Sequence, residues 1–153
     1  MIDVNEKFLE IFVRSSVEIH DNLIVKSGGL AGTKSIGLLE SAISSLAYCE
    51  TFDEQITNLV FSIAKNHAFI DGNKRSSIAI GAYFLAVYGY SEFIIGRFIV
   101  EMEDIILMVV CRFIDKEDLG EFVSLIINDL PYHEELQIKW ILAKQKVDEL
   151  YGD

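Results

Sequence analysis

The chain has 153 residues, of which 51% are hydrophobic, and a formal net charge of −11. This length suits one domain with a single buried core, and the composition excludes a disordered or loop-rich protein. The acidic balance argues against nucleic acid or an anionic membrane as the main partner, because such binding depends on clustered Lys and Arg.

No segment has the composition of a membrane span or of a secretory signal. No window of about 18 residues is both apolar and uncharged, and residues 1–7 lack a basic stretch followed by an apolar run. Cys49 and Cys111 each lie in an apolar stretch without a second Cys or a His at metal-ligand spacing. We therefore expect a cytoplasmic protein with two reduced thiols, no nucleic-acid partner and no membrane partner.

The first half of the chain is predicted to form three helices, at residues 6–25, 36–48 and 52–67. Apolar residues return near the helical period in each of these ranges. Thr51 and Glu54 have the spacing of a capping box, which predicts where the third helix begins.

A glycine-rich segment separates the first two helices. Glycines permit backbone conformations and close approaches that other residues do not. The segment is therefore expected to form a mobile flap or a short β-hairpin near residues 28–37. Its glycines are Gly28, Gly29, Gly32 and Gly37.

The second half begins with an apolar stretch at residues 77–87, which predicts a central helix buried nearly all round. The short apolar run at residues 93–95 is read as an extended segment. Two further helices are predicted at residues 98–113 and 117–128, the second capped by Asp115.

The last segment of the chain is amphipathic. It is expected to pack on its own bundle, or on a partner as a dimer contact. Its predicted apolar stripe consists of Tyr132, Leu136, Trp140, Ala143, Val147 and Leu150.

The most informative stretch runs from His67 to Arg75 and joins a predicted helix end to a predicted helix start. The first amides of a helix are unpaired, and the helix dipole favours an anion there. Gly72 permits the tight turn that aims successive N–H groups at one point. Lys74 and Arg75 add two cations, the Arg as a bidentate fork on phosphate oxygens. This combination suits a di- or triphosphate.

Two residues of the same stretch suit the chemistry of a transfer reaction. Asp71 offers the hard oxygen ligand that Mg²⁺ takes from proteins. His67 is the residue best suited to accept a proton near neutral pH. Together they indicate phosphoryl or nucleotidyl transfer to a hydroxyl.

Each of these residues also has a purely structural interpretation. A lone His at a helix end is commonly solvated, Asp-Gly is a common turn, and Asn73 is a common helix cap. Phe69 is expected in the core under either interpretation. The occurrence of these residues together, in this order, favours the functional one.

The pattern His-x-Phe-x-Asp-Gly-Asn-Lys-Arg at residues 67–75 resembles the signature loop of the Fic/Doc (Fido) family. It is most similar to the Doc, or death-on-curing, branch, in which Lys follows the Asn, whereas Fic enzymes usually have Gly there. Residues 19–21 and 28–32 also resemble the stretch before and through the flap of the family. The resemblance covers roughly residues 5–128.

This resemblance implies an all-α Fic/Doc helical bundle. The family domain would span residues 1–130, and residues 131–153 would form a C-terminal amphipathic helix that packs on it or on a partner.

The resemblance also implies a role for each matching residue. His67 would be the catalytic base, Asp71 the Mg²⁺ ligand and Phe69 the anchor of the loop in the core. The implied phosphate or nucleotide site consists of Gly72, Asn73, Lys74, Arg75 and the additional basic residue Lys65. The implied flap, which aligns a protein substrate by strand-like pairing, contains Gly28, Gly29, Leu30 and Gly32. His20 is expected to be structural or close to the flap, and His133 to lie at the surface.

Departures from the Fic pattern bear on the reaction. Lys74 replaces the usual Gly, and Ile78 stands where Fic enzymes that transfer AMP carry a second Arg. Doc-like proteins share both features, which implies that ATP presents its γ-phosphate to the target. The predicted activity is therefore ATP- and Mg²⁺-dependent phosphorylation of a Ser or Thr of a cytosolic protein, by a Doc-like toxin of a toxin–antitoxin pair. AMP transfer and a catalytically silent interaction module are the alternatives.

The expected partners follow from the same resemblance. The substrate of the Doc branch is elongation factor Tu, which applies here by analogy only. The inhibitory pattern of the family, Ser or Thr followed four residues later by Glu and then Gly or Asn, does not occur in this sequence. Control is therefore expected from a separate antitoxin chain, for which the C-terminal helix is one candidate surface, and a homodimer is a further alternative.

Overall fold

The computed structural model describes residues 1–152 and shows an all-α bundle of seven α-helices and one short 3₁₀-helix. Within these residues no β-strand occurs, and the single antiparallel bridge joins Thr33 to Phe69. The predicted all-α class is confirmed. The elements are α1 (Glu6–Ser27), α2 (Ile36–Ser44), η1 (Ser45–Tyr48), α3 (Phe52–Asn66), α4 (Asn73–Val87), α5 (Glu92–Val110), α6 (Lys116–Ile127) and α7 (Glu134–Tyr151).

Side-chain caps define where several helices begin. The Thr51 hydroxyl accepts the Glu54 amide, as predicted. The Glu54 carboxylate, however, accepts the amide of Glu50 at 2.8 Å rather than that of Thr51, so the reciprocal half of the predicted capping box lies one residue upstream. The predicted Asp115 cap of α6 is confirmed, and it forms a complete capping box with Asp118.

The extended segment predicted at residues 93–95 is wrong, because these residues lie in the first turn of α5. The Ser91 hydroxyl accepts the amide of Ile94 at 3.2 Å and caps the helix. The short apolar run continues at helical spacing into the buried Phe98 and Met102, and such a run does not by itself distinguish a strand from a helix.

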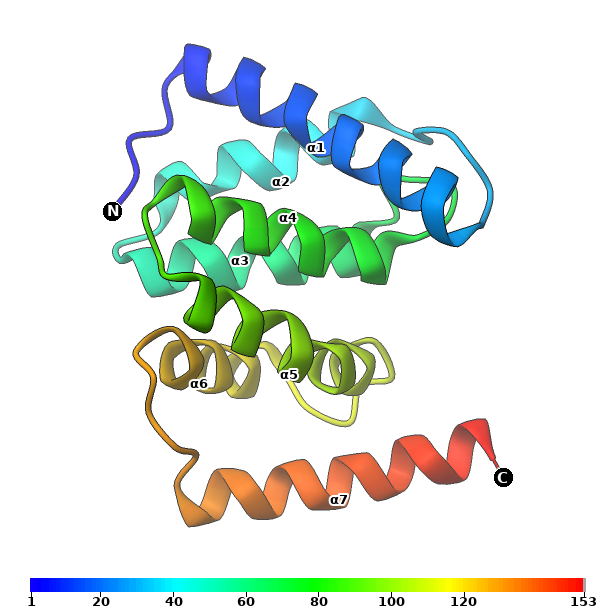
Figure 1. Cartoon of the computed structure of the whole chain (residues 1–153), viewed down its shortest axis with the longest axis vertical. Coiled ribbons are helices and arrows are strands. Elements are labelled where there is room, and N and C mark those ends of the chain that lie inside the picture. The colour runs from blue at the N-terminus through cyan, green and yellow to red at the C-terminus, as the bar shows by residue number, and fades with distance from the viewer. Residues whose placement is uncertain (153) are drawn as a thin grey trace.

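The core lies around α3 and α4, which occupy the middle of the bundle. Figure 1 shows α1 and α2 on one side of this pair, α5 and α6 on the other, and α7 outermost. Gly81 of α4 allows this close packing, since a Cβ there would lie 2.8 Å from Val60 Cγ2 and 2.9 Å from Phe98 Cζ. The largest buried aromatic side chains are Phe69, Phe84, Phe98 and Phe122.

The last helix, α7, packs against α5. It is capped by His133, whose Nδ1 accepts the amide of Leu136. Lys144 pairs with Asp104 of α5 at 3.3 Å. Of the predicted apolar stripe, Leu150 is exposed, while Tyr132, Leu136, Trp140, Ala143 and Val147 are buried or packed against the core.

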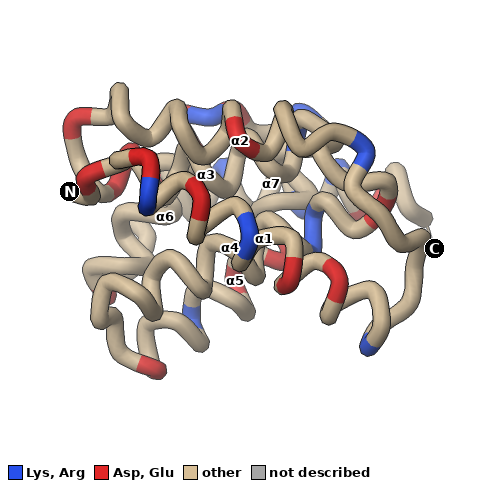
Figure 2. Tube along the Cα trace, turned by 90° about the horizontal axis from the view of Figure 1, so that it is seen from above, with Lys and Arg blue, Asp and Glu red and all other residues tan. Residues whose placement is uncertain are grey.

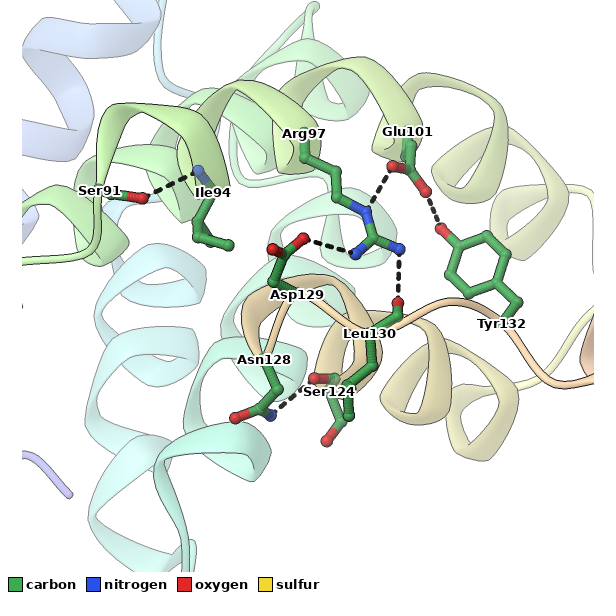
Figure 3. Close-up of polar contacts among 9 residues, drawn as sticks. All are labelled: Ser91, Ile94, Arg97, Glu101, Ser124, Asn128, Asp129, Leu130 and Tyr132. Carbon is green, nitrogen blue, oxygen red and sulfur yellow. Dashed lines mark hydrogen bonds and ion pairs between the residues drawn. The ribbon is translucent and has the colours of Figure 1, made fainter.

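An arginine on α5 holds the connection between α6 and α7 (Figure 3). Arg97 donates to the Glu101 carboxylate at 2.7 Å and to the Leu130 carbonyl at 2.8 Å, and it lies 3.5 Å from the Asp129 carboxylate. The Tyr132 hydroxyl also bonds to Glu101. This network fixes the start of the last segment on α5.

Charged residues of both signs are interspersed along the helices (Figure 2). Across residues 1–152, none of the helices combines the length and the apolar character needed to cross a bilayer.

Candidate functional site

Two residues with left-handed backbone bracket the loop that joins α3 to α4. His67 has φ 55° and ψ 43° at the end of α3, and Gly72 has φ 77° and ψ 21° at the start of α4. His tolerates this conformation better than most residues with a Cβ. Gly72 offers no side-chain cap, and the first amide of α4 to bond within the helix is that of Ser76. The start of α4 therefore presents its first N–H groups to a ligand.

The loop is held in shape by its own side chains. The Asn73 amide group bonds to both sides of the Phe69 backbone, accepting from its N–H at 3.1 Å and donating to its carbonyl at 3.0 Å. The Phe69 ring is buried and stacks on the His20 ring, with centroids 4.0 Å apart. His20 Nε2 in turn lies 2.7 Å from the Asp71 carbonyl. Phe69 is thus a core residue, as expected under either interpretation of the motif.

The flap, which we define as residues 28–35, lies along this loop and is joined to it by backbone hydrogen bonds. The Ala68 carbonyl accepts the amides of Lys34 and Ser35 at 2.8 and 2.9 Å, and the Ile70 amide donates to the Gly32 carbonyl at 3.1 Å. The hairpin alternative for this region is therefore wrong, because the backbone partners of the flap lie in the loop and not within the flap.

Asp71 is the residue on which the flap and the loop converge. Its Oδ2 accepts the amide of Leu30 at 3.0 Å, and its Oδ1 accepts the amide of Gly72 at 2.7 Å. The hydrogen bond from Leu30 contributes most to lowering the pKa of the Asp71 carboxyl, and the bond from Gly72 contributes next. The nearby cations Arg75 and Lys74 lower this pKa further. Asp71 is therefore ionised at neutral pH.

The flap approaches so closely that it needs a glycine. Gly29 has φ 119°, and a Cβ there would lie 2.8 Å from Asp71 Oδ2 and 3.0 Å from an Nη of Arg75. The other Arg75 nitrogen, Nη1, donates to the Ser27 hydroxyl at 2.7 Å, at the end of α1. The backbone of the flap and the end of α1 together position Asp71 and Arg75.

Six of the twelve predicted site residues line one cavity of about 260 Å³, which we call the loop cavity. His67 and Lys74 are exposed there. The wall is completed by Ala64, Ile70, Asp71, Gly72, Asn73, Arg75 and, from α5, Val110.

The additional basic residue Lys65 does not line the loop cavity. It lines an adjacent cavity, with its Nζ 5.7 Å from the centroid of the Phe61 ring.

Asp71 is suited to hold a Mg²⁺ that is also bound by phosphate. Each of its oxygens accepts one N–H and retains a lone pair for a cation. Within residues 1–152 no group of three or more His, Cys, Asp or Glu is arranged to hold a metal. Mg²⁺ commonly binds through one or two carboxylates and completes its shell with phosphate and water, so the residues present fit a nucleotide-bound ion.

Two residues that hold this site in place lie outside the predicted motif. His20 is buried beneath the loop, and Ser27 bonds to Arg75. His20 was expected to be structural or close to the flap, and its contacts with Phe69 and Asp71 agree with this expectation. No local pattern marks Ser27, because its partner lies 48 residues further along the chain.

Comparison with known proteins agrees with this site. The model of the Fic/DOC family matches residues 13–85, a range that extends from α1 through the flap, the loop and most of α4. No curated protein and no solved structure gave a significant match. The family match supports a place for this region in the Fic/Doc family, whose members are typically transferases.

Proposed function

We propose that the protein transfers the γ-phosphate of ATP, with Mg²⁺, to a Ser or Thr hydroxyl of another protein. The observation that carries this proposal is that a histidine, an ionised carboxylate and two cations line one cavity at an uncapped helix start. These residues are His67, Asp71, Lys74 and Arg75.

Each group has a distinct task in this reaction. His67, exposed at the cavity, accepts the proton of the incoming hydroxyl. The cations Lys74 and Arg75, together with the amides at the start of α4, hold phosphate oxygens. Asp71 holds Mg²⁺, which when bound offsets the charge of the phosphates. The remaining contribution of the protein is to position these groups.

Phosphate transfer is favoured over AMP transfer by two positions on α4. Lys74 occupies the second residue of the helix and projects a cation where open backbone would otherwise face the nucleotide. Ile78, one turn later, is half-buried and packs against the core, so it contributes no second clamp. A catalytically silent interaction module is disfavoured because His67 and Asp71 are both present in the cavity.

The reaction is tested with ATP labelled either at the γ- or at the α-phosphate, in the presence of Mg²⁺ and a bacterial protein extract. We expect a γ-label on one or a few proteins, with a mass gain of one phosphate on a Ser or Thr. His67→Ala is expected to abolish the transfer while the protein remains folded. Labelling from the α-position, with a mass gain of AMP, would replace phosphorylation by AMP transfer. Absence of any His67-dependent label supports the interaction module.

We further propose a toxin-like role with control by a separate antitoxin chain. Elongation factor Tu is the first substrate to try, on the analogy with the Doc branch. Expression in bacteria should arrest growth for the wild type and not for His67→Ala. Equal growth of the two strains would contradict the toxin role.

A further inference from the structure

A second cavity of about 400 Å³ adjoins the loop cavity, and three cationic side chains line it. The two cavities are lined by consecutive residues, with Ala64 and Val110 in the loop cavity and Lys65 and Val109 in the second. We call this second space the basic cavity. Its principal side chains are Phe61, Lys65, Arg112, Phe113 and Lys116.

The three cations of the basic cavity are not neutralised by the protein. Within residues 1–152, Lys65, Arg112 and Lys116 form no ion pair, whereas Arg14, Arg97, Lys139 and Lys144 do. The Nζ atoms of Lys65 and Lys116 lie 5.7 and 5.4 Å from the centroid of the Phe61 ring. A fourth cation, that of Lys146, lies 5.9 Å from the centroid of Phe113.

The acidic residues at the rim of the basic cavity already have partners. Asp115 caps α6 by accepting the amide of Asp118 at 2.8 Å. Asp118 pairs with Lys139 at 2.9 Å. With Asp118 paired to Lys139, the three cations of the basic cavity face one further carboxylate in its lining, that of Asp115. The cavity therefore has a local positive excess, although the whole chain has a net charge of −11.

The backbone at Arg112 gives a second reason to assign a role to this surface. Arg112 has φ 64° and follows Cys111, the C-cap of α5. Glycine is the usual residue at such a left-handed position, and a side chain there is strained. A strained residue beside a cavity suggests a functional use for its side chain.

We infer that the basic cavity binds the carboxylates of an acidic segment in the protein substrate, next to the hydroxyl that accepts the phosphate. This inference rests on the proposed function. Two ammonium groups near the Phe61 ring and a separate guanidinium suit several single carboxylates along a peptide. A polyphosphate would bind better in the loop cavity, because that cavity offers helix amides and an ionised metal ligand.

The test uses a fluorescein-labelled peptide of alternating Glu and Ser and a matched peptide of alternating Gln and Ser, without ATP. His67→Ala serves as the binding protein, so that turnover plays no part. We expect the Glu peptide to bind more tightly than the Gln peptide, and the difference to shrink as salt is raised. Arg112→Gly and Lys116→Gln, each added to this background, should weaken binding of the Glu peptide about two- to fivefold, the range for exposed ion pairs. Lys7→Gln, with the same charge change in the first turn of α1, should leave it unaltered.

Arg112→Gly separates loss of binding from loss of folding, because it removes the strained side chain. Its melting temperature should equal or exceed that of the parent while its peptide affinity falls. Equal binding of the Glu and Gln peptides would overturn the inference, as would undiminished binding by both variants. A fall in ATP affinity instead of peptide affinity would assign the cavity to the nucleotide and would also overturn it.

The two proposals fail in different ways. If the Glu peptide binds as expected but the wild type transfers no phosphate, the proposed function fails and the acidic docking site stands. If the wild type phosphorylates proteins and the Arg112 and Lys116 variants show unchanged preference for acidic peptides, the docking site fails and the function stands.

Discussion

The Nε2 atom of His20 lies 2.7 Å from the backbone oxygen of Asp71 and joins α1 to the proposed metal ligand. Because a carbonyl oxygen only accepts, Nε2 carries the hydrogen of this bond. The same imidazole ring lies flat on Phe69, so one buried side chain fixes both the apolar anchor of the loop and the backbone of its acidic residue. The position of α1 therefore determines the position of the loop.

Replacement of His20 should separate these two contributions. His20→Phe retains an aromatic ring on Phe69 but leaves the Asp71 carbonyl without its donor, and we expect a loss of about 1–3 kcal/mol in the free energy of unfolding. His20→Gln, which retains a donor, should restore part of this loss and slow the exchange of the Gly72 amide relative to His20→Phe. Urea denaturation and amide exchange measure the two effects. Indistinguishable exchange at Gly72 in the two variants would mean that the hydrogen bond does not position the loop.

Two adjacent glycines in the flap provide a matched pair for testing its approach to Asp71. Both have positive φ, but a Cβ on Gly28 meets nothing within 4 Å, whereas one on Gly29 would lie 2.8 Å from Asp71 Oδ2. Gly28→Ala should cost about 1–3 kcal/mol from backbone strain alone, because φ 85° and ψ 171° lie in a region that essentially only glycine adopts. Gly29→Ala should cost more and also weaken ATP·Mg²⁺ binding, as measured by calorimetry. Equal nucleotide affinity in the two variants would show that the flap does not constrain Asp71.

Acid should loosen the attachment of the flap. The amides of Leu30 and Gly72 lower the pKa of Asp71 in the folded protein, below the value of about 3.9 for an unfolded Asp. The resulting stabilisation is fully present above about pH 3.9 and is lost as the pH falls through the lower, folded value. Asp71→Asn should therefore show a shallower decline in the free energy of unfolding between neutral and acidic pH than the wild type does. Parallel curves for the two proteins would contradict this assignment.

Arg97 should be needed for the attachment of α7. Its guanidinium is mostly buried, with 18% of the side chain exposed, and it bonds to Glu101 and Leu130. Arg97→Ala leaves these partners unsatisfied and should cost about 1–3 kcal/mol, with the largest gain in amide exchange along α7. Arg14→Ala removes an ion pair with Glu10 that is 65% and 72% exposed, so it should change stability by less than about 1 kcal/mol. Similar losses in the two variants would mean that the Arg97 network contributes no more than a surface pair.

The helices and most of their starts could be predicted because their signals are local. The hydroxyl of Thr51 and the carboxylate of Asp115 each act on an amide three residues away. The start of α5 was missed because the short run at residues 93–95 has no period of its own, and only its continuation into Phe98 shows the helix.

The site could be predicted only in part, for a physical reason. His67, Asp71, Lys74 and Arg75 are close in sequence, so any tight turn brings them together. The groups that hold them in place are distant in sequence: His20 is 51 residues from its partner Asp71. Lys65 lines the neighbouring cavity because adjacent residues on a helix point about 100° apart, and on α3 it is Ala64 that faces the loop cavity.

The flap has two edges, and the loop uses only one of them. The Gly32 carbonyl and the Lys34 amide point toward the loop, so in an extended chain the N–H and carbonyl of Thr33 between them point the opposite way. A peptide that pairs with this outer edge would be recognised through its main chain, which is the same in every sequence. Such an edge would orient a bound peptide without selecting its sequence, and selection would then depend on side-chain contacts elsewhere on the protein.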